Sequence, residues 1–478
     1  MIGIEKKPEQ LTPVYNEMLI VATSSNIDKK GFKFVADVYC RSELVSRLKI
    51  AVNPDGYGVF DISRHIQSVM SFDFDNENYG FNKAVNSFAT YSVDLREEYY
   101  YDWEFYDIDS VDGFLGLIGT VSTIFEAGDE IVVQQDAPNN TPFYNGLATI
   151  ISITESGGEY IIKTNKVWNG KSGTQSGNIV LSYYRTYISD VEDTTGTLYA
   201  FNGVLDFVDF INWDPDYYAA TVSGGNFLTN MPDNYKVKIE NQMFLNIYNT
   251  VPELVEYLLI ESNTGKFAIN NPYYELSGDD YEKLVQVACG PYDLLTHTSS
   301  ILVITGSLPV IDDDTKEYTI WCDKAIDEKV IKIDRSCSRY ENIELIFMDK
   351  LGSFIPFNFN LVSRNNKNIT RTNYGQNYMG YGNSVNNWNY KTYDRGTRTL
   401  DILVNEEFTI NSNWLDQSTS DFIMELFESP EVYWKKSVDV YVAINIMDIR
   451  VEKKKIVNDQ LINYTVMFEL SVKNNKQK

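Results

Sequence analysis

The sequence alternates apolar and polar residues with a period of two over many short stretches, and this pattern is typical of half-buried β-strands. In the stretch from Phe32 to Cys40, every second residue is apolar, which places one continuous apolar face on a strand. Similar strands are predicted at Glu130–Gln135, Leu147–Ile153, Glu159–Thr164, Asn178–Tyr184, Tyr235–Ile239, Glu317–Cys322, Val330–Ile333, Ile343–Met348, Thr399–Val404, Asp439–Ile444 and Leu461–Leu470.

Turn dipeptides between these stretches favour antiparallel pairing, because Asn-Gly and Asp-Gly supply the positive φ angles of tight hairpins. They occur at Asp55-Gly56, Asp112-Gly113, Asn145-Gly146, Asn169-Gly170 and Asn202-Gly203. Only two helices are predicted, at Asp61–Met70 and at about Ser418–Glu428, the second with Ser/Thr caps and a stop before Pro430. The predicted fold is therefore mainly β, a multi-domain antiparallel β-sandwich or barrel architecture with few short helices.

The chain has 478 residues, of which 43% are hydrophobic, so it can form several cores. Between about Gly113 and Ser182 lie four short predicted strands with polar, Gly-rich connections, flanked on both sides by Tyr-rich sequence. This pattern indicates a small β-barrel inserted into a hairpin of the parent domain, whose flanking strands should pair with each other. The predicted domains are an N-terminal β domain (1–112), the inserted barrel (113–182), the rest of the N-terminal and central β domain (183–310) and a C-terminal β domain (311–478).

An Asn-, Tyr- and Gly-rich run at 364–398 separates two predicted strands of the C-terminal domain. Two interpretations remain open: a long surface loop, or an arm that becomes ordered against another chain. Tyr and Asn suit the second, because they offer contact area and hydrogen bonds at modest entropic cost. The interface residues predicted on this arm are Tyr374, Tyr378, Tyr381, Trp388, Tyr390 and Tyr393.

The charge balance is strongly acidic, with 41 basic against 67 acidic residues and a net charge of −26. Such a surface repels phosphate backbones and anionic lipids, so direct nucleic-acid binding and membrane insertion are not expected. The N-terminus does not have the pattern of a signal peptide, and no apolar run approaches the roughly 18 residues of a membrane span. We therefore expect assembly in a cytoplasm.

The sequence offers little material for catalysis or metal binding. Its only histidines are His65, on a predicted short helix, and His297, at the start of a polar loop, and neither accompanies a nucleophile motif. The acidic stretch that begins at Asp107 fails the spacing of a calcium loop, and Asp312-Asp313-Asp314 is interpreted as a turn, with a surface cation site as the alternative. No catalytic, cofactor-binding or metal-binding residue is predicted, and no cofactor is expected.

Several short motifs resemble structural tail proteins of phages that infect Bacteroidetes, including the crAss-like podoviruses. In the C-terminal third these are the stretch from Arg339 to Phe354, Trp414 before a helix ending near Tyr433, and Lys453-Lys454-Lys455 before Leu461–Glu469. In the N-terminal part they are Pro13–Asn16, Phe34–Tyr39, Gly58–Ser63 and the stretch from Gly128 to Gly146. The resemblance implies a virion structural role at the tail hub or a tail ring, and it carries no catalytic residues.

Two function classes follow. The first is a structural virion protein of a phage tail, a hub, ring or adaptor component, which forms a homo-oligomer and connects other tail proteins without catalysis. The second is a carbohydrate-binding, receptor-binding or glycan-cleaving tail module that contacts a host surface glycan, because exposed aromatic rings can also stack on sugars. The absence of a solenoid repeat in the sequence favours the first class.

Overall fold

A computed structural model of the chain describes residues 2–74, 77, 79–119, 125–135, 144, 146–168, 175–221, 224–250, 255–274, 283–322, 326–376, 380–381, 388–389, 396–437, 440–448, 450–455 and 461–472. The structure is 53% strand and 9% helix, which confirms the predicted mainly β class with several antiparallel sheets and few short helices. The chain divides into two compact units, one formed by Met1–Thr12, Glu17–Val69 and Ala89–Ala200, and the other by Pro13–Asn16, Met70–Phe88 and Phe201–Lys478.

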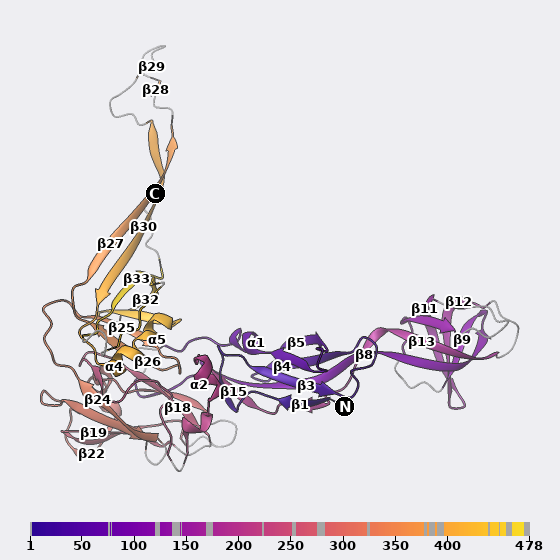
Figure 1. Ribbon diagram of the computed structural model, residues 1–478, viewed down its shortest axis with the longest axis horizontal. Helices are drawn as coiled ribbons and strands as arrows, with labels where there is room; N and C mark the ends of the chain where they lie inside the picture. Colours follow the sequence, from indigo (N-terminus) through magenta and orange to yellow (C-terminus); the bar gives the residue numbers. More distant parts are fainter. Residues whose placement is uncertain are drawn as a thin grey trace. The chain divides into compact units, whose positions relative to one another are not determined.

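The first unit contains a three-stranded sheet in the order β1-β3-β6 and an eleven-stranded sheet (Figure 1). On β4, Phe34, Ala36, Val38 and Cys40 are all buried, as predicted, but Val35 and Asp37 of the opposite face are buried as well. The elements of this unit are β1 (Ile2–Lys6), β2 (Leu11–Pro13), β3 (Leu19–Ser24), β4 (Lys33–Cys40), β5 (Glu43–Ala51), β6 (Gly58–Asp61), α1 (Ser63–Gln67), β8 (Phe88–Val111), β9 (Phe114–Gly119), β10 (Glu130–Gln135), β11 (Gly146–Ser156), β12 (Glu159–Val167), β13 (Gln175–Ile188), β14 (Asp193–Thr194) and β15 (Leu198–Phe201).

The Tyr-rich strands that flank the predicted insertion do pair with each other, as expected, because Tyr99 and Tyr100 of β8 lie opposite Tyr187 and Thr186 of β13. Between them, β9, β12, β11 and β10 are joined by antiparallel pairings, and β10 pairs with β13. The segment has its own apolar core, to which β8 contributes Ile108.

In the segment predicted as a small barrel, β8, β9, β12, β11, β10 and β13 are successive antiparallel neighbours, and β13 pairs again with β8. Strands β8 and β13 also form one long ribbon, whose register shifts between Ser176 and Ile179 and again between Ser182 and Thr186. The structure therefore shows an antiparallel β segment carried by a long two-stranded ribbon.

The second unit contains an eleven-stranded sheet in the order β27-β30-β33-β32-β31-β25-β26-β18-β21-β7, with β16 beside β18, and a six-stranded sheet in the order β17-β24-β23-β19-β20-β22. Side chains from both sheets share one large apolar core, which is the arrangement of a β-sandwich. The strands are β7 (Phe81–Lys83), β16 (Ala219–Ala220), β17 (Tyr235–Val237), β18 (Phe244–Asn249), β19 (Tyr257–Ser262), β20 (Gly265–Asn270), β21 (Leu284–Ala288), β22 (Ile301–Gly306), β23 (Glu317–Cys322), β24 (Ile326–Ile333), β25 (Ile343–Met348), β26 (Phe354–Phe359), β27 (Arg364–Gly375), β28 (Gly380–Tyr381), β29 (Trp388–Asn389), β30 (Thr397–Asn411), β31 (Val432–Ser437), β32 (Val440–Ile446) and β33 (Thr465–Leu470).

The helices of this unit are short: α2 (Phe207–Ile211), α3 (Pro291–Thr296), α4 (Gln417–Phe422) and α5 (Met424–Glu428), with 3₁₀ turns at Pro215–Tyr217 and Thr298–Ser300. The single helix predicted near Ser418–Glu428 is instead the pair α4 and α5. At Ile423 the backbone tightens, because the Leu426 N–H donates to the carbonyl of Ile423, only three residues back. The cap of α4 is Asp416, whose carboxylate accepts from the Thr419 N–H at 2.8 Å.

Candidate functional site

The most exposed structured part of the second unit is the hairpin of β27 and β30. Figure 1 shows these two strands extending beyond the rest of their sheet. Their antiparallel register runs from Arg364 opposite Thr409 to Gly375 opposite Thr397, with one shift between Thr372 and Asn373. All twelve residues of β27 are exposed. We call β27 and β30 together the hairpin arm.

The base of the hairpin arm is fixed in the core of the unit. Residues Glu407–Asn411 of β30 pair with β33, and Ile410 is fully buried. The Phe408 ring stacks on Phe468, with the ring centroids 5.0 Å apart. Beyond Glu407, toward the tip, the described residues of β30 pair only with β27, so the outer part of the arm is a two-stranded ribbon.

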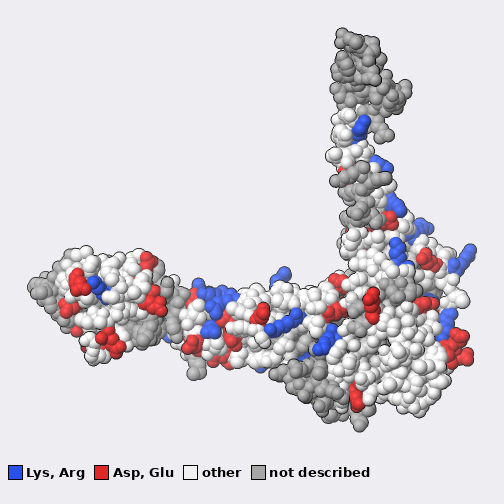
Figure 2. Space-filling view, turned by 180° about the vertical axis from the view of Figure 1, so that it is seen from behind, with Lys and Arg blue, Asp and Glu red and all other residues white. Residues whose placement is uncertain are grey.

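Strand β27 ends the strand order of its sheet, so one of its backbone edges pairs with no strand in the described part of the chain. It carries Arg364, Lys367 and Arg371 and no acidic residue, and Figure 2 shows Lys and Arg side chains along this part of the molecule. The Lys367 ammonium lies 2.9 Å from the Glu406 carboxylate, and this hydrogen-bonded contact lowers the pKa of Glu406. Charged side chains on an open edge prevent indiscriminate strand pairing while leaving the edge available to a specific partner.

The structure places only some of the predicted interface residues. Tyr374 lies near the end of β27 and is 42% exposed. The backbones of Tyr381 and Trp388 lie opposite each other in the β28–β29 pair. Tyr378, Tyr390 and Tyr393 lie outside the described residues. Within the run 364–398, residues 364–375 and 397–398 are therefore paired strand rather than irregular loop.

Sequence reasoning missed a pair of carboxyl groups, the buried Asp349 and the half-buried Glu425. One Asp349 oxygen accepts from the Thr229 hydroxyl at 2.5 Å, and the other accepts from backbone N–H groups of the following turn. Glu425 of α5 accepts from the Lys350 N–H at 2.9 Å and from the Asn230 amide at 3.0 Å. Burial raises the pKa of both groups. Since these oxygens are bonded to the chain itself, the pair anchors α5 to the turn after β25.

Two further buried carboxyl groups have similar environments. Burial raises the pKa of Asp293 to about 7, although it accepts hydrogen bonds from the Gln242 amide and from the backbone N–H groups of Met243 and Gly290. Burial also raises the pKa of Glu344, on β25, to about 7, with the Lys435 ammonium 3.7 Å from its carboxylate. An acidic residue inside the apolar run at Ile343–Met348 is the one sequence signal that could have identified such a group.

The residues considered for chemistry do not form a centre in the described part of the chain. His65 lies on α1, as expected, and His297 follows α3. The Asp312 carboxylate accepts from the N–H groups of Asp314 and Thr315, which confirms the predicted turn. Among the described residues, no three His, Cys, Asp or Glu side chains are grouped to hold a metal ion. No described helix has the length and apolarity needed to cross a membrane.

Comparison with protein-family models gives no match, and no curated protein matches the chain.

Proposed function

We propose that this chain is a structural protein of a phage tail, a hub, ring or adaptor component, which assembles with copies of itself and with other tail proteins and performs no catalysis. The observation that carries the assembly role is the hairpin arm, in which the twelve residues of β27 are all exposed. The assignment to a tail draws on the motif resemblance of the sequence.

The outer part of the hairpin arm lacks the packed face that usually stabilises paired strands. Fixing the backbone costs about 1–2 kcal/mol per residue, whereas an exposed cross-strand pair contributes only about 0.2–1 kcal/mol. A two-stranded hairpin without a packed face is marginal in water. Contact with a partner along β27 supplies the missing packing and satisfies the open backbone edge.

Charge favours a second copy of the chain as one such partner. Strand β27 carries three basic and no acidic residues, whereas the whole chain has a net charge of −26. Although β30 carries Asp401, Glu406 and Glu407, the open edge belongs to β27, and its basic side chains are attracted to the acidic surface of neighbouring copies. This arrangement orients assembly through the arm.

The test removes the outer arm and leaves its base. Lys367 and Glu406 lie opposite each other, so residues 368–405 can be replaced by an Asn-Gly turn. We expect the full chain to form a defined oligomer and the shortened variant to remain a folded monomer, measured by native mass spectrometry and light scattering.

A matched control shortens a different hairpin. Thr154 and Ile161 are partners in the β11–β12 pair, so residues 155–160 can be replaced by the same turn. This variant should retain the oligomer. A full chain that stays monomeric, or an arm-shortened variant that assembles as the full chain does, contradicts the proposed function.

A further inference from the structure

A polar pocket of about 160 Å³ lies in the second unit, between the end of β26 and the segment that joins β30 to α4. We infer that this pocket binds one neutral sugar residue, with Trp414 stacking on the sugar ring and Asn360 accepting a hydrogen bond from a hydroxyl group. The inference goes beyond the assembly role and concerns residues outside the hairpin arm. The lining residues that matter here are Lys236, Asp334, Asn358, Asn360, Trp414 and Asp416.

Trp414 provides an exposed aromatic ring on a firmly held backbone. Its side chain is 55% exposed, which is unusual for so large an apolar group. On one side, the Ser412 N–H donates to the Tyr464 carbonyl at 2.8 Å. On the other, the Leu415 N–H donates to the Ile462 carbonyl at 2.8 Å, and α4 begins directly after its cap, Asp416. A ring held in this way can accept the apolar C–H face of a sugar at little entropic cost.

Asn360 provides a buried acceptor that the described chain does not use. The residue is 7% exposed, and its side-chain oxygen has no hydrogen-bond partner. Its backbone carbonyl is bonded, because the Ser338 hydroxyl donates to it at 2.6 Å. An unpaired buried acceptor destabilises the unoccupied pocket, whereas a ligand hydroxyl in the pocket would satisfy it.

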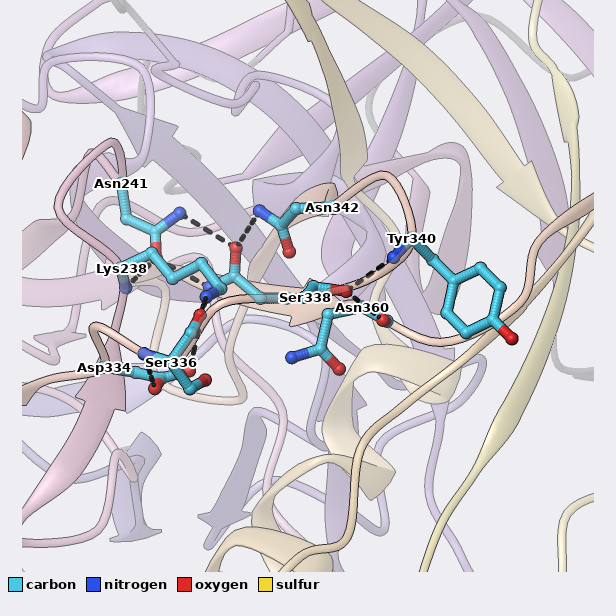
Figure 3. Close-up of polar contacts among 9 residues, drawn as sticks. Lys238, Asn241, Asp334, Ser336, Ser338, Tyr340, Asn342 and Asn360 are labelled. Atoms are coloured by element: carbon cyan, nitrogen blue, oxygen red, sulfur yellow. Dashed lines mark hydrogen bonds and ion pairs between the residues drawn. The ribbon is translucent and has the colours of Figure 1, made fainter.

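The neighbouring side-chain amides, in contrast, are hydrogen-bonded to one another (Figure 3). The Asn358 amide donates to Asn241 at 2.7 Å and accepts from Asn342 at 2.8 Å. In Figure 3, the Asn360 side chain points away from this network, and no dashed line reaches its amide group. Unlike Asn358, Asn360 therefore has a side-chain oxygen that is free to accept a hydrogen bond from a ligand.

The charges that line the pocket select a neutral ligand. The Asp334 carboxylate accepts from the Ser336 N–H and lies 3.4 Å from the Lys238 ammonium, while Asp416 caps α4. Hydrogen bonds from these partners hold the pKa of both carboxyl groups below the usual value, although burial opposes the shift. The lining holds two ionised carboxylates and one ammonium group, that of Lys236, so its net negative charge disfavours an anionic sugar or a phosphate. Because both carboxylates are already paired within the chain, a cation would have to compete for them.

The size of the pocket limits the ligand further. A volume of about 160 Å³ is well above the roughly 10–15 Å³ that one water needs, and below the roughly 300–1,000 Å³ of sites for drug-sized ligands. One sugar residue at the end of a glycan fits this range. A ligand of that size, with so few contacts, is expected to bind with a dissociation constant of about 1 mM.

The test measures binding of methyl glycosides of glucose, galactose, mannose and N-acetylglucosamine to the full chain, by saturation-transfer NMR and tryptophan fluorescence. At least one glycoside should bind saturably at about 1 mM. Trp414→Ala and Asn360→Leu should each weaken that binding at least tenfold. Tyr340→Ala is the matched control, because Tyr340 is an exposed aromatic residue that does not line the pocket, and it should leave binding unchanged.

Three results would overturn the inference: no saturable binding by any of the four glycosides, equal binding by Trp414→Ala and the unaltered chain, or equal loss in Tyr340→Ala. If Asn360→Leu fails to fold, Trp414→Ala can still be compared with the unaltered chain. Trp414 is exposed, so this substitution removes little buried area and should leave the chain folded. The titration does not depend on the hairpin arm, so the arm-shortened variant should bind the same glycoside. Loss of assembly and loss of sugar binding are thus separate results.

Discussion

Strands β25 and β27 belong to the same sheet but have opposite environments. All six residues of β25 are buried, whereas all twelve residues of β27 are exposed. Both make regular antiparallel ladders, β25 with β26 and β31, and β27 with β30. Strand β25 therefore has a paired neighbour on each edge and β27, within the described residues, on one edge only, but the larger difference lies in the side chains. The two strands differ in side-chain packing. Packing within the chain stabilises β25, whereas the side chains of β27 would be packed only by a partner chain.

The same contrast appears in one residue type. Glu344 of β25 is buried, and burial raises its pKa to about 7. Glu406 of β30 lies in the arm, where the hydrogen bond from Lys367 lowers its pKa. Burial penalises the charged form of the first, and a nearby cation favours the charged form of the second. Strand β25 and the hairpin arm thus differ in how their stability responds to pH as well as to side-chain truncation.

The largest loss of stability is expected when a buried side chain of β25 is truncated. Phe347 of β25 is fully buried and lies 5.5 Å from the Phe422 ring, measured between centroids. Phe347→Ala should reduce the local stability of β25 and β26 by about 3–5 kcal/mol, because it removes apolar contact and leaves a cavity. Hydrogen exchange of peptides from these strands measures the change within the second unit.

The matched variant for that experiment is Ile369→Ala on β27, where the side chain is 47% exposed. In the monomer it should change stability by less than about 0.5 kcal/mol. Equal losses in the two variants would contradict the view that packing separates these strands.

The second prediction concerns pH. The folded-state pKa of Glu344, about 7, lies above its ordinary value of 4.5, so the folded state binds more protons between these values. This carboxyl group therefore contributes full stability below about pH 4.5, and the contribution is lost as the pH rises through about 7. Between pH 5 and pH 8 the loss from Glu344 should be about 2–3 kcal/mol, and Glu344→Gln should remove this part of the pH dependence and leave the part from Asp293, whose pKa is also raised to about 7.

Glu406→Gln is the control for the pH experiment. Because the pKa of Glu406 is lowered, its contribution is lost only as the pH falls below its ordinary value of 4.5. This variant should retain the unaltered dependence between pH 5 and pH 8, as measured by denaturant unfolding at each pH. An unchanged slope in Glu344→Gln would show that Glu344 is not the responsible group.

Local structure was predictable where one residue pattern dominated. The predicted bounds at Glu130–Gln135, Glu317–Cys322 and Ile343–Met348 coincide with β10, β23 and β25, because alternation or a short apolar run is a strong strand signal. Strand β27 was missed, since Arg, Asn and Thr in succession have no apolar period. The break at Ile423 was also missed, because a tightened helical turn leaves no mark in an apolar pattern.

The candidate sites depend on contacts that sequence spacing does not reveal. Asp349 and Glu425 are separated by 76 positions, and only the packing of α5 on the turn after β25 brings both carboxyl groups beside Asn230. The sugar pocket similarly combines Asn360, after β26, with Trp414, before α4. The arm was predicted from its Tyr and Asn content. Its antiparallel pairing could not be predicted from the same residues, because it depends on the partner strand β30.

The smallest effect on the monomer is expected from reversing one charge on the exposed strand. Lys367 is largely exposed and pairs with Glu406, and such a surface pair contributes about 0.2–1 kcal/mol. Lys367→Glu should therefore leave the unfolding of the monomer nearly unchanged. In the oligomer, however, it places an acidic group on the basic strand that faces an acidic neighbour, and we expect the dissociation constant of the oligomer to rise about tenfold at low salt. Lys316→Glu makes the same charge change at an exposed position outside the arm. If both variants weaken assembly equally, general repulsion between acidic chains explains the effect. A loss confined to Lys367→Glu, and diminished by added salt, assigns the attraction to β27.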